Sequence, residues 1–375
     1  MSISFRIAAG GMLLALAANA WAQSGHLPGV TLASQDSGVD VRLRGMSAVS
    51  DKVAWASGGD GTVLRTVDGG RQWQVIRVPG AAGLDFRDIE GVDANRAVVL
   101  SIGPGEASRV YRTADGGRSW QLAFQNREPA AFLDCMAFDG AHGVILGDPV
   151  DGRFQVLETR DGGEHWALRD GSPKGADGEA AFAASGTCIA LGGGTIVFVT
   201  GGARARAHYL IDAGDGEPPR WQATPAADTA PVPSAGYFSV ASVPHGFIAV
   251  GGDYEQPDAD GLLASLPKNP APGVSATLGY REQPGPAGYR SGIACTGDAN
   301  CIATGPSGTD WWNGEAWTAV SSRGFDAIDL VGDSGWASGE GGRIARITIG
   351  AADAVTADAA PVETAQASAA GDSGD

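Results

Sequence analysis

The sequence predicts an all-β protein, a seven-bladed β-propeller of four-stranded antiparallel blades. A segment of the form Thr-x-Asp-Gly-Gly-x-x-Trp occurs three times, with its aspartates 47 and 46 residues apart. A period of this size is typical of propellers or helical arrays. A short strand ending in glycine also recurs seven times, each time after another predicted strand. The intervening runs are short, rich in Val, Ile, Phe and Trp, and interrupted by glycine, which favours strands over helices.

We expect each blade to open with an innermost strand. The residues that open these strands are Arg44, Arg87, Asp134, Phe182, Phe238, Arg290 and Asp326. The glycines that end the second strands are Gly58, Gly103, Gly147, Gly192, Gly251, Gly305 and Gly339. Blade five carries a proline-rich stretch at 253–286, expected to be a long loop or irregular hairpin. Blade seven is one strand short, and residues 30–35 are predicted to close the ring as its outermost strand, which removes an exposed seam.

The three repeated segments resemble the Asp-box, also called the bacterial neuraminidase repeat, and we predict that each one forms and stabilises a hairpin turn. In such a turn the aspartate accepts backbone N–H bonds, the glycines adopt positive φ, and the tryptophan packs beneath the hairpin. We therefore assign structural and not catalytic roles to Asp68, Asp115, Asp161, Trp73, Trp120 and Trp166.

The two ends of the chain and its net charge indicate where the protein is located and which partners it can have. Residues 1–22 read as a signal peptide, with Arg6 before an apolar run and a cleavage site after Ala22, which predicts a periplasmic or secreted protein. The apolar run is short for a membrane span. Residues 23–350 would form one propeller, a monomer, and residues 351–375 a disordered acidic tail. A net charge of −17 argues against nucleic acid as a partner.

Four cysteines fall into two pairs of different character. Cys295 and Cys301 flank a predicted hairpin turn in blade six, where antiparallel pairing brings them within disulfide reach. Cys135 opens a first strand, whereas Cys188 opens a predicted second strand that runs the other way. We expect Cys135 and Cys188 to lie at opposite ends of adjacent blades as buried free thiols. No spacing of cysteine and histidine indicates a metal site.

Four further segments carry a resemblance to a known family: 85–90, 147–154, 178–182 and 339–344. Together with the repeats, over about residues 30–350, they resemble the photosystem II stability and assembly factors, which are seven-bladed Asp-box propellers. The resemblance implies a non-enzymatic helper without a cofactor, which binds a protein partner, such as a subunit of a membrane complex, during assembly.

The candidate binding site is the channel mouth, because the first strands of a propeller line its central channel. Glu179, Asp88 and Tyr289 are expected beside the ring formed by Arg44, Arg87, Asp134, Phe182, Phe238, Arg290 and Asp326. Two interpretations remain open. The charges can pair with one another at a wet channel mouth, or the arginines can bind an acidic group while the phenylalanines stack on a planar one.

An alternative function is a glycoside hydrolase of the sialidase type, since sialidases also carry Asp-boxes and bind a carboxylate with three arginines. Its chemistry needs a tyrosine nucleophile paired with a glutamate, for which Tyr289 or Tyr237 with Glu179 are the candidates. The Phe/Tyr-Arg-Ile-Pro segment of sialidases is absent, and the predicted ring has one blade more than theirs. A quinoprotein-like oxidoreductase would need a cofactor motif, which we do not find in the sequence.

Overall fold

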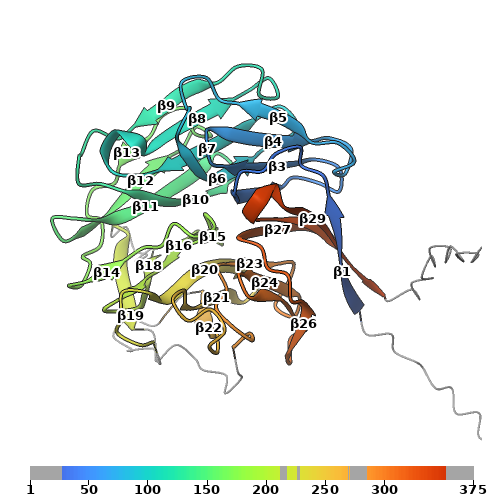
Figure 1. The fold of residues 1–375 in the computed structure, drawn as a ribbon. Coiled ribbons are helices and arrows are strands. Elements are labelled where there is room, and N and C mark those ends of the chain that lie inside the picture. The colour runs from blue at the N-terminus through green and yellow to red at the C-terminus, as the bar shows by residue number, and fades with distance from the viewer. Residues whose placement is uncertain (1–27, 212–217, 226–228, 269, 271–284, 352–375) are drawn as a thin grey trace, which may run out of the picture. The chain divides into compact units, whose positions relative to one another are not determined.

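The structure is a computed structural model that describes residues 28–211, 218–225, 229–268, 270 and 285–351. The predicted signal peptide lies outside these residues, as does the predicted acidic tail except for its first residue, Ala351, which ends a strand. Residues 30–350 form one compact unit, and its strands are arranged in seven antiparallel sheets, confirming the predicted seven-bladed propeller (Figure 1).

Blades one, two, three and six are built from strands that follow one another outward from the channel. Blade one comprises β2 (Leu43–Ala48), β3 (Ala54–Gly58), β4 (Thr62–Thr66) and β5 (Gln74–Arg77). Blade two comprises β6 (Asp85–Gly91), β7 (Ala97–Ile102), β8 (Arg109–Thr113) and β9 (Gln121–Gln125). Blade three comprises β10 (Leu133–Asp139), β11 (His142–Val150), β12 (Arg153–Thr159) and β13 (Ala167–Leu168). Blade six comprises β23 (Gly292–Cys295), β24 (Cys301–Gly305), β25 (Gly308–Trp312) and β26 (Trp317–Ser321).

Blade four is also built from strands in chain order, with only β17 left out, whereas blades five and seven take strands from other parts of the chain. Blade four comprises β15 (Ile189–Gly192), β16 (Thr195–Val199), β18 (Arg206–Ile211) and β19 (Arg220–Pro225). Blade five has β20 (Ala235–Val243), β21 (Gly246–Asp253) and β22 (Leu262–Pro267), extended at its inner edge by the short strands β17 (Gly201–Gly202) and β14 (Glu179–Ala180). Blade seven comprises β27 (Ala327–Val331), β28 (Ser334–Ser338), β29 (Ile344–Ala351) and, outermost, β1 (Pro28–Gln35). The predicted closure of the ring by the N-terminal strand is therefore confirmed. Short 3-10 turns η1 (Gly105–Ala107) and η2 (Glu340–Gly342) precede β8 and β29.

The first strand of blade four was assigned wrongly. The strand at 189–192 is the innermost strand of its sheet and not the second. Phe182 opens no strand, since it lies in the irregular segment between β14 and β15. The second strand is β16, which is followed by Thr200 and the two glycines of β17.

The Asp-box turns have the same geometry in blades one to three. In blade two, Asp115 Oδ1 accepts the Ser119 backbone N–H at 2.9 Å, and Thr113 Oγ1 accepts the Gly117 N–H at 3.0 Å. Gly116 and Gly117 adopt φ of 76° and 83°, which other residues rarely tolerate. Trp73 of the first box is buried against Trp336 of blade seven, so the box also joins neighbouring blades.

Neighbouring innermost strands are joined by side chains that accept a backbone N–H from the next blade. This contact recurs around much of the ring, with acceptor and donor pairs Ser47 and Gly91 (3.0 Å), Asp88 and Met136 (2.6 Å), Ser239 and Ile293 (2.9 Å), and Asp329 and Ala48 (2.7 Å). Blades three and four are joined differently, by a disulfide between Cys135 and Cys188.

The disulfide between Cys135 and Cys188 corrects the expectation of free thiols. Both cysteines are fully buried, and their Cα atoms are 5.8 Å apart. The expectation failed because Cys188 precedes an innermost strand, β15, and therefore lies at the same end of its blade as Cys135. Cys295 and Cys301 form the predicted disulfide across the β23–β24 hairpin. The two disulfides indicate an oxidising compartment outside the cytoplasm.

Candidate functional site at the channel mouth

Bulges at the start of the innermost strands place side chains at the channel mouth. The pairing register slips by one residue in β2, β6, β10 and β20, and the extra residues are Arg44, Arg87, Asp134 and Phe238. A bulge leaves its extra residue outside the regular ladder and redirects the side chain. Four of the seven predicted ring positions are therefore bulge residues.

A cavity of about 430 Å³ lies at this mouth. Its lining includes six of the residues predicted from the sequence: Arg44, Arg87, Phe182, Phe238, Tyr289 and Asp326. It also includes residues that the sequence analysis missed, notably Arg42 and Tyr254. Arg42 lies two residues before Arg44, so the repeated arginine was a usable signal. Tyr254 follows directly after β21, within the proline-rich stretch predicted as a long loop or irregular hairpin.

Two of the three arginines in the cavity are already paired. Arg42 donates two hydrogen bonds to the Asp326 carboxylate, at 2.9 and 2.6 Å, and joins blade one to blade seven. Arg87 donates to Asp85 at 3.0 Å and to the backbone carbonyl of Ala183. In each pair one member, Arg42 or Asp85, lies outside the predicted ring, so the ring residues Asp326 and Arg87 are paired with neighbouring residues and not with one another.

Arg44 differs from the other two arginines. Among the described residues, its half-buried guanidinium has no hydrogen-bond or ion-pair partner. Burial, followed by the positive charges of Arg87 and Arg42, lowers the pKa of Arg44 to about 10. The side chain is still protonated at neutral pH, so the cavity holds one uncompensated positive charge, which an acidic group could neutralise.

Aromatic side chains line the same cavity and give it apolar surface beside the arginines. Phe182 stacks on Phe238, with ring centroids 4.0 Å apart and planes within 9°. Tyr254 contacts both rings edge-on, and Tyr289 packs edge-on against Phe238 at 4.7 Å. Such a wall offers stacking and edge contacts to a planar or apolar group beside the Arg44 charge.

Arg290 and Glu179, both predicted at or beside the ring, do not line the cavity. Arg290 is buried and pairs with the buried Asp310, its Nε and Nη2 lying 2.7 and 2.5 Å from Oδ2. Glu179 on β14 is buried too, and it accepts bonds from His208 (2.8 Å), Arg206 and Thr200. Burial alone would raise the pKa of Glu179, but the bonds from His208 and Arg206 lower it to about 2. Arg206 opens β18, 27 residues further along the chain, and no sequence pattern links it to Glu179.

Asp88 and Asp134 are also buried and lie outside the cavity lining. Asp88 serves as the acceptor between blades two and three described above. The Oδ2 atom of Asp134 has no hydrogen-bond partner within the part of the chain that the structure describes. Burial raises the pKa of both carboxyl groups well above the usual range, with Glu90 adding to the effect on Asp88 and Asp148 to that on Asp134.

The chain is similar to solved protein structures. No protein-family model and no curated protein sequence matches the chain. A solved structure of YCF48 bound to D1 peptide superposes with a TM-score of 0.56 and 13% identity, covering 84% of this chain and 94% of that one. YCF48 from Cyanidioschyzon merolae gives a TM-score of 0.58 and 14% identity, covering 85% and 99%.

The chain has the fold of YCF48. YCF48 is a photosystem II assembly factor, so the resemblance drawn from the sequence holds at the level of the fold. The described residues include no helix that is long and apolar enough to cross a membrane. They also include no cluster of three His, Cys, Asp or Glu side chains that could hold a metal ion.

Proposed function

We propose that this chain is an exported, non-catalytic propeller that binds a protein partner, and that a carboxylate of the partner enters the cavity beside Arg44. The observation that carries the proposal is the guanidinium of Arg44, which has no partner among the residues that the structure describes and lies in a cavity that aromatic rings also line. A cation without a partner in a half-buried site is costly, and an incoming carboxylate would form charge-assisted hydrogen bonds with it.

Three further observations support the binding role. The cavity, at about 430 Å³, has room for one or two side chains of a partner. The disulfides fit export by the signal peptide that we infer for residues 1–22. YCF48, which has the same fold, was solved with a D1 peptide bound, so a propeller of this kind can hold a segment of another protein. An assembly or scaffold role for this chain, with a subunit of a membrane complex as its partner, is part of the proposal.

One observation supports the sialidase-like alternative: three arginines, Arg42, Arg44 and Arg87, line the same cavity. Two features weigh against it. Glu179, the proposed base, is bound to His208 and Arg206 and does not line the cavity. Burial raises the pKa of Tyr289, which makes its phenol a poorer nucleophile at neutral pH. Turnover of a fluorogenic sialoside that is lost in an Arg44→Gln variant would favour the enzyme over the binding protein.

The binding proposal is tested with a small probe that carries both features the cavity offers. N-acetylphenylalanine combines a carboxylate with an aromatic ring, and its amide lacks only the charge. Calorimetric titration should detect binding of the acid and at least about tenfold weaker binding of the amide.

Capture of a protein partner is the second test. Capture from membrane and periplasmic extracts should enrich a partner on the wild type but not on Arg44→Gln. The matched control is Arg220→Gln, an exposed arginine on β19, which should capture as the wild type does.

A further inference from the structure

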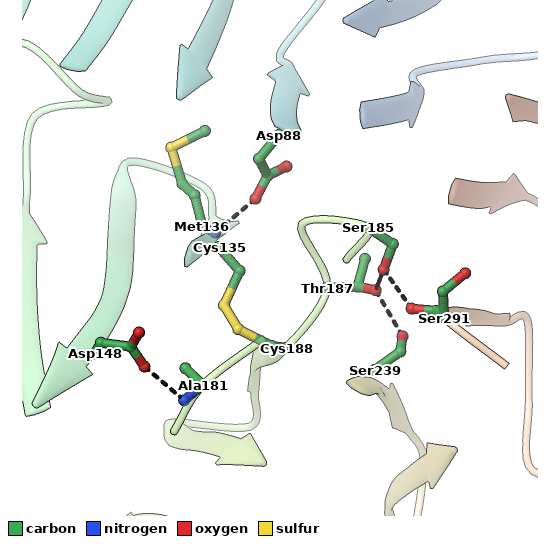
Figure 2. The surroundings of a disulfide bond; sticks show 10 residues. All are labelled: Asp88, Cys135, Met136, Asp148, Ala181, Ser185, Thr187, Cys188, Ser239 and Ser291. Atoms are coloured by element: carbon green, nitrogen blue, oxygen red, sulfur yellow. Dashed lines mark hydrogen bonds between the residues drawn. A yellow bond between two sulfur atoms is a disulfide. The ribbon is translucent and has the colours of Figure 1, made fainter. Parts of the chain in front are cut away.

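The channel is crossed by a segment of the chain itself. Residues 181–188, which we call the channel plug, run between β14 and β15 (Figure 2). Ala183 accepts a bond from Arg87 of blade two, while Ser185 Oγ donates to the Ser291 carbonyl of blade six at 2.6 Å. Blades two and six lie on opposite sides of the ring, so a segment that touches both must pass across the channel axis.

Further contacts fix both ends of the plug. The Ala181 N–H donates to Asp148 Oδ1 of blade three at 2.9 Å. The Thr187 carbonyl accepts the Val240 N–H of blade five at 2.8 Å, and the Thr187 hydroxyl lies 2.6 Å from the Ser239 hydroxyl. Figure 2 shows the disulfide between Cys188 and Cys135 directly after these bonds. The plug is thus held by hydrogen bonds along its length and by a covalent bond at its end.

Small residues allow the plug to fit in the channel. Ala183, Ala184, Ser185 and Gly186 follow one another, and Gly186 adopts a φ of 80°. A Cβ at position 186 would lie 2.5 Å from the Asp88 carboxyl carbon. Small side chains bring little packing of their own, and the segment forms no strand, so its order must come from these tethers.

The plug forms part of the cavity at the channel mouth. Phe182, Ala183 and Ala184 all line the cavity, and Phe182 supplies one half of the stacked pair with Phe238. The Ala183 carbonyl also holds Arg87, whose charge faces Arg44. Movement of the plug would therefore displace the aromatic wall and one of the arginines together.

The disulfide occupies the position where other blades use a hydrogen bond. Cys135 follows the bulge residue of its strand, as Asp88 and Ser239 follow theirs. Asp88 and Ser239 accept an N–H from the next blade, whereas Cys135 is bonded to the end of the plug. The residues that lead into blade four cross the channel, and the covalent link occurs at the end of this segment.

We propose that the channel plug is the positioning element of the mouth cavity, and that the Cys135–Cys188 disulfide holds it in the geometry that binds ligand. The inference rests on the proposed function, since it concerns ligand binding at the same cavity. Both cysteines are fully buried, so the bond acts as a permanent lock and not as a switch that soluble reductants reach.

The test compares two disulfide-free variants of the full mature chain. Cys135→Ala with Cys188→Ala removes the lock, and Cys295→Ala with Cys301→Ala removes the hairpin disulfide of blade six, which does not line the cavity. In the first variant we expect faster hydrogen exchange in 182–187, retained protection in the innermost strands, and about tenfold weaker binding of N-acetylphenylalanine. The control should keep wild-type affinity and wild-type exchange of the plug.

Other outcomes separate this inference from the proposed function. If the wild type does not bind the probe, the proposed function fails, and exchange alone decides whether the disulfide orders the plug. Unchanged exchange in 182–187, or faster exchange with unchanged affinity, would overturn the inference. Should the first variant not fold, Ser185→Ala with Gly186→Ala keeps the disulfide but disturbs the plug, and it must weaken binding if the plug positions the cavity.

Discussion

Arg42 and Asp326 form a two-point ion pair, with bonds of 2.9 and 2.6 Å, across the junction where the first and last blades meet. The pair neutralises one of the arginines at the channel mouth and leaves Arg44 as the cation without a partner among the described residues. The positive charge that the cavity offers to a ligand is therefore that of Arg44 and not that of Arg42.

Replacing Asp326 by Asn should release Arg42 and raise the affinity of the cavity for anions. The Asp326 carboxylate raises the pKa of Arg42, mainly through their hydrogen bonds. Arg42 is 44% exposed, so water screens the pair and its loss should lower the free energy of unfolding by only about 1 kcal/mol. Titration with N-acetylphenylalanine measures the first effect, and urea unfolding measures the second. Weaker probe binding in Asp326→Asn would contradict this role of the pair.

Replacing Arg290 by Met should destabilise the fold strongly, because Arg290 and Asp310 are a buried pair with side chains only 2% and 3% exposed. Loss of one partner leaves a buried, uncompensated charge, at a cost of about 3–5 kcal/mol in the free energy of unfolding. A second change, Asp310→Leu, should restore part of that stability. If Arg290→Met unfolds like the wild type in urea, the pair is not structural.

The free energy of unfolding should fall as the pH rises, because burial raises the pKa of the Glu90 carboxyl group. Burial, and then the charge of Asp329, raise the pKa of Glu90 from 4.5 to about 8. A group whose pKa is higher in the folded state contributes its stability below the unfolded pKa and loses it as the pH rises through the folded one. Glu90→Gln should therefore be more stable than the wild type at about pH 8.5, by about 2 kcal/mol after allowance for water in the channel. Equal unfolding free energies at about pH 8.5 would show that Glu90 ionises freely.

Ionisation of Asp115, in the Asp-box of blade two, should have the opposite effect from that of Glu90 and stabilise the fold. Hydrogen bonds from the Ser119 hydroxyl and backbone N–H lower the pKa of Asp115 from 3.8 to about 2. The ionised form thus stabilises the fold above about pH 4, and this contribution disappears as the pH falls through about 2. Asp115→Asn should lower the urea midpoint at neutral pH, with the gap to the wild type closing in acid. A gap that is independent of pH would rule out this linkage.

The repeated parts of the fold were predictable from the sequence, and the irregular parts were not. Asp68, Asp115 and Asp161 set the blade period, and the missing strand of blade seven identified the N-terminal strand that closes the ring. Each of these depends on local turn chemistry and on counting strands. Six of the predicted site residues line one cavity. Three of them, Arg44, Arg87 and Phe238, do so because they occupy equivalent bulge positions of the repeat, whereas Phe182 lies there as part of the channel plug.

The errors have a common origin in blade four. The segment around Phe182 follows no strand pattern, and its path depends on contacts with residues far away in the chain, such as Arg87 and Ser291. Assigning a strand there displaced the next strand by one place, and Cys188 was consequently put at the wrong end of its blade. The partners of Arg290 and Glu179 could not be predicted either, since the pairs with Asp310 and Arg206 depend on tertiary packing.

The affinity of N-acetylphenylalanine for the wild type and for Arg44→Gln is the most direct measure of the binding site. Because Arg44 is the cavity arginine without a partner in the described part of the chain, the variant should bind the acid at least about tenfold more weakly, and it should no longer prefer the acid to the amide. Equal binding of the acid by the wild type and Arg44→Gln, at equal thermal stability, would contradict a carboxylate site at the channel mouth.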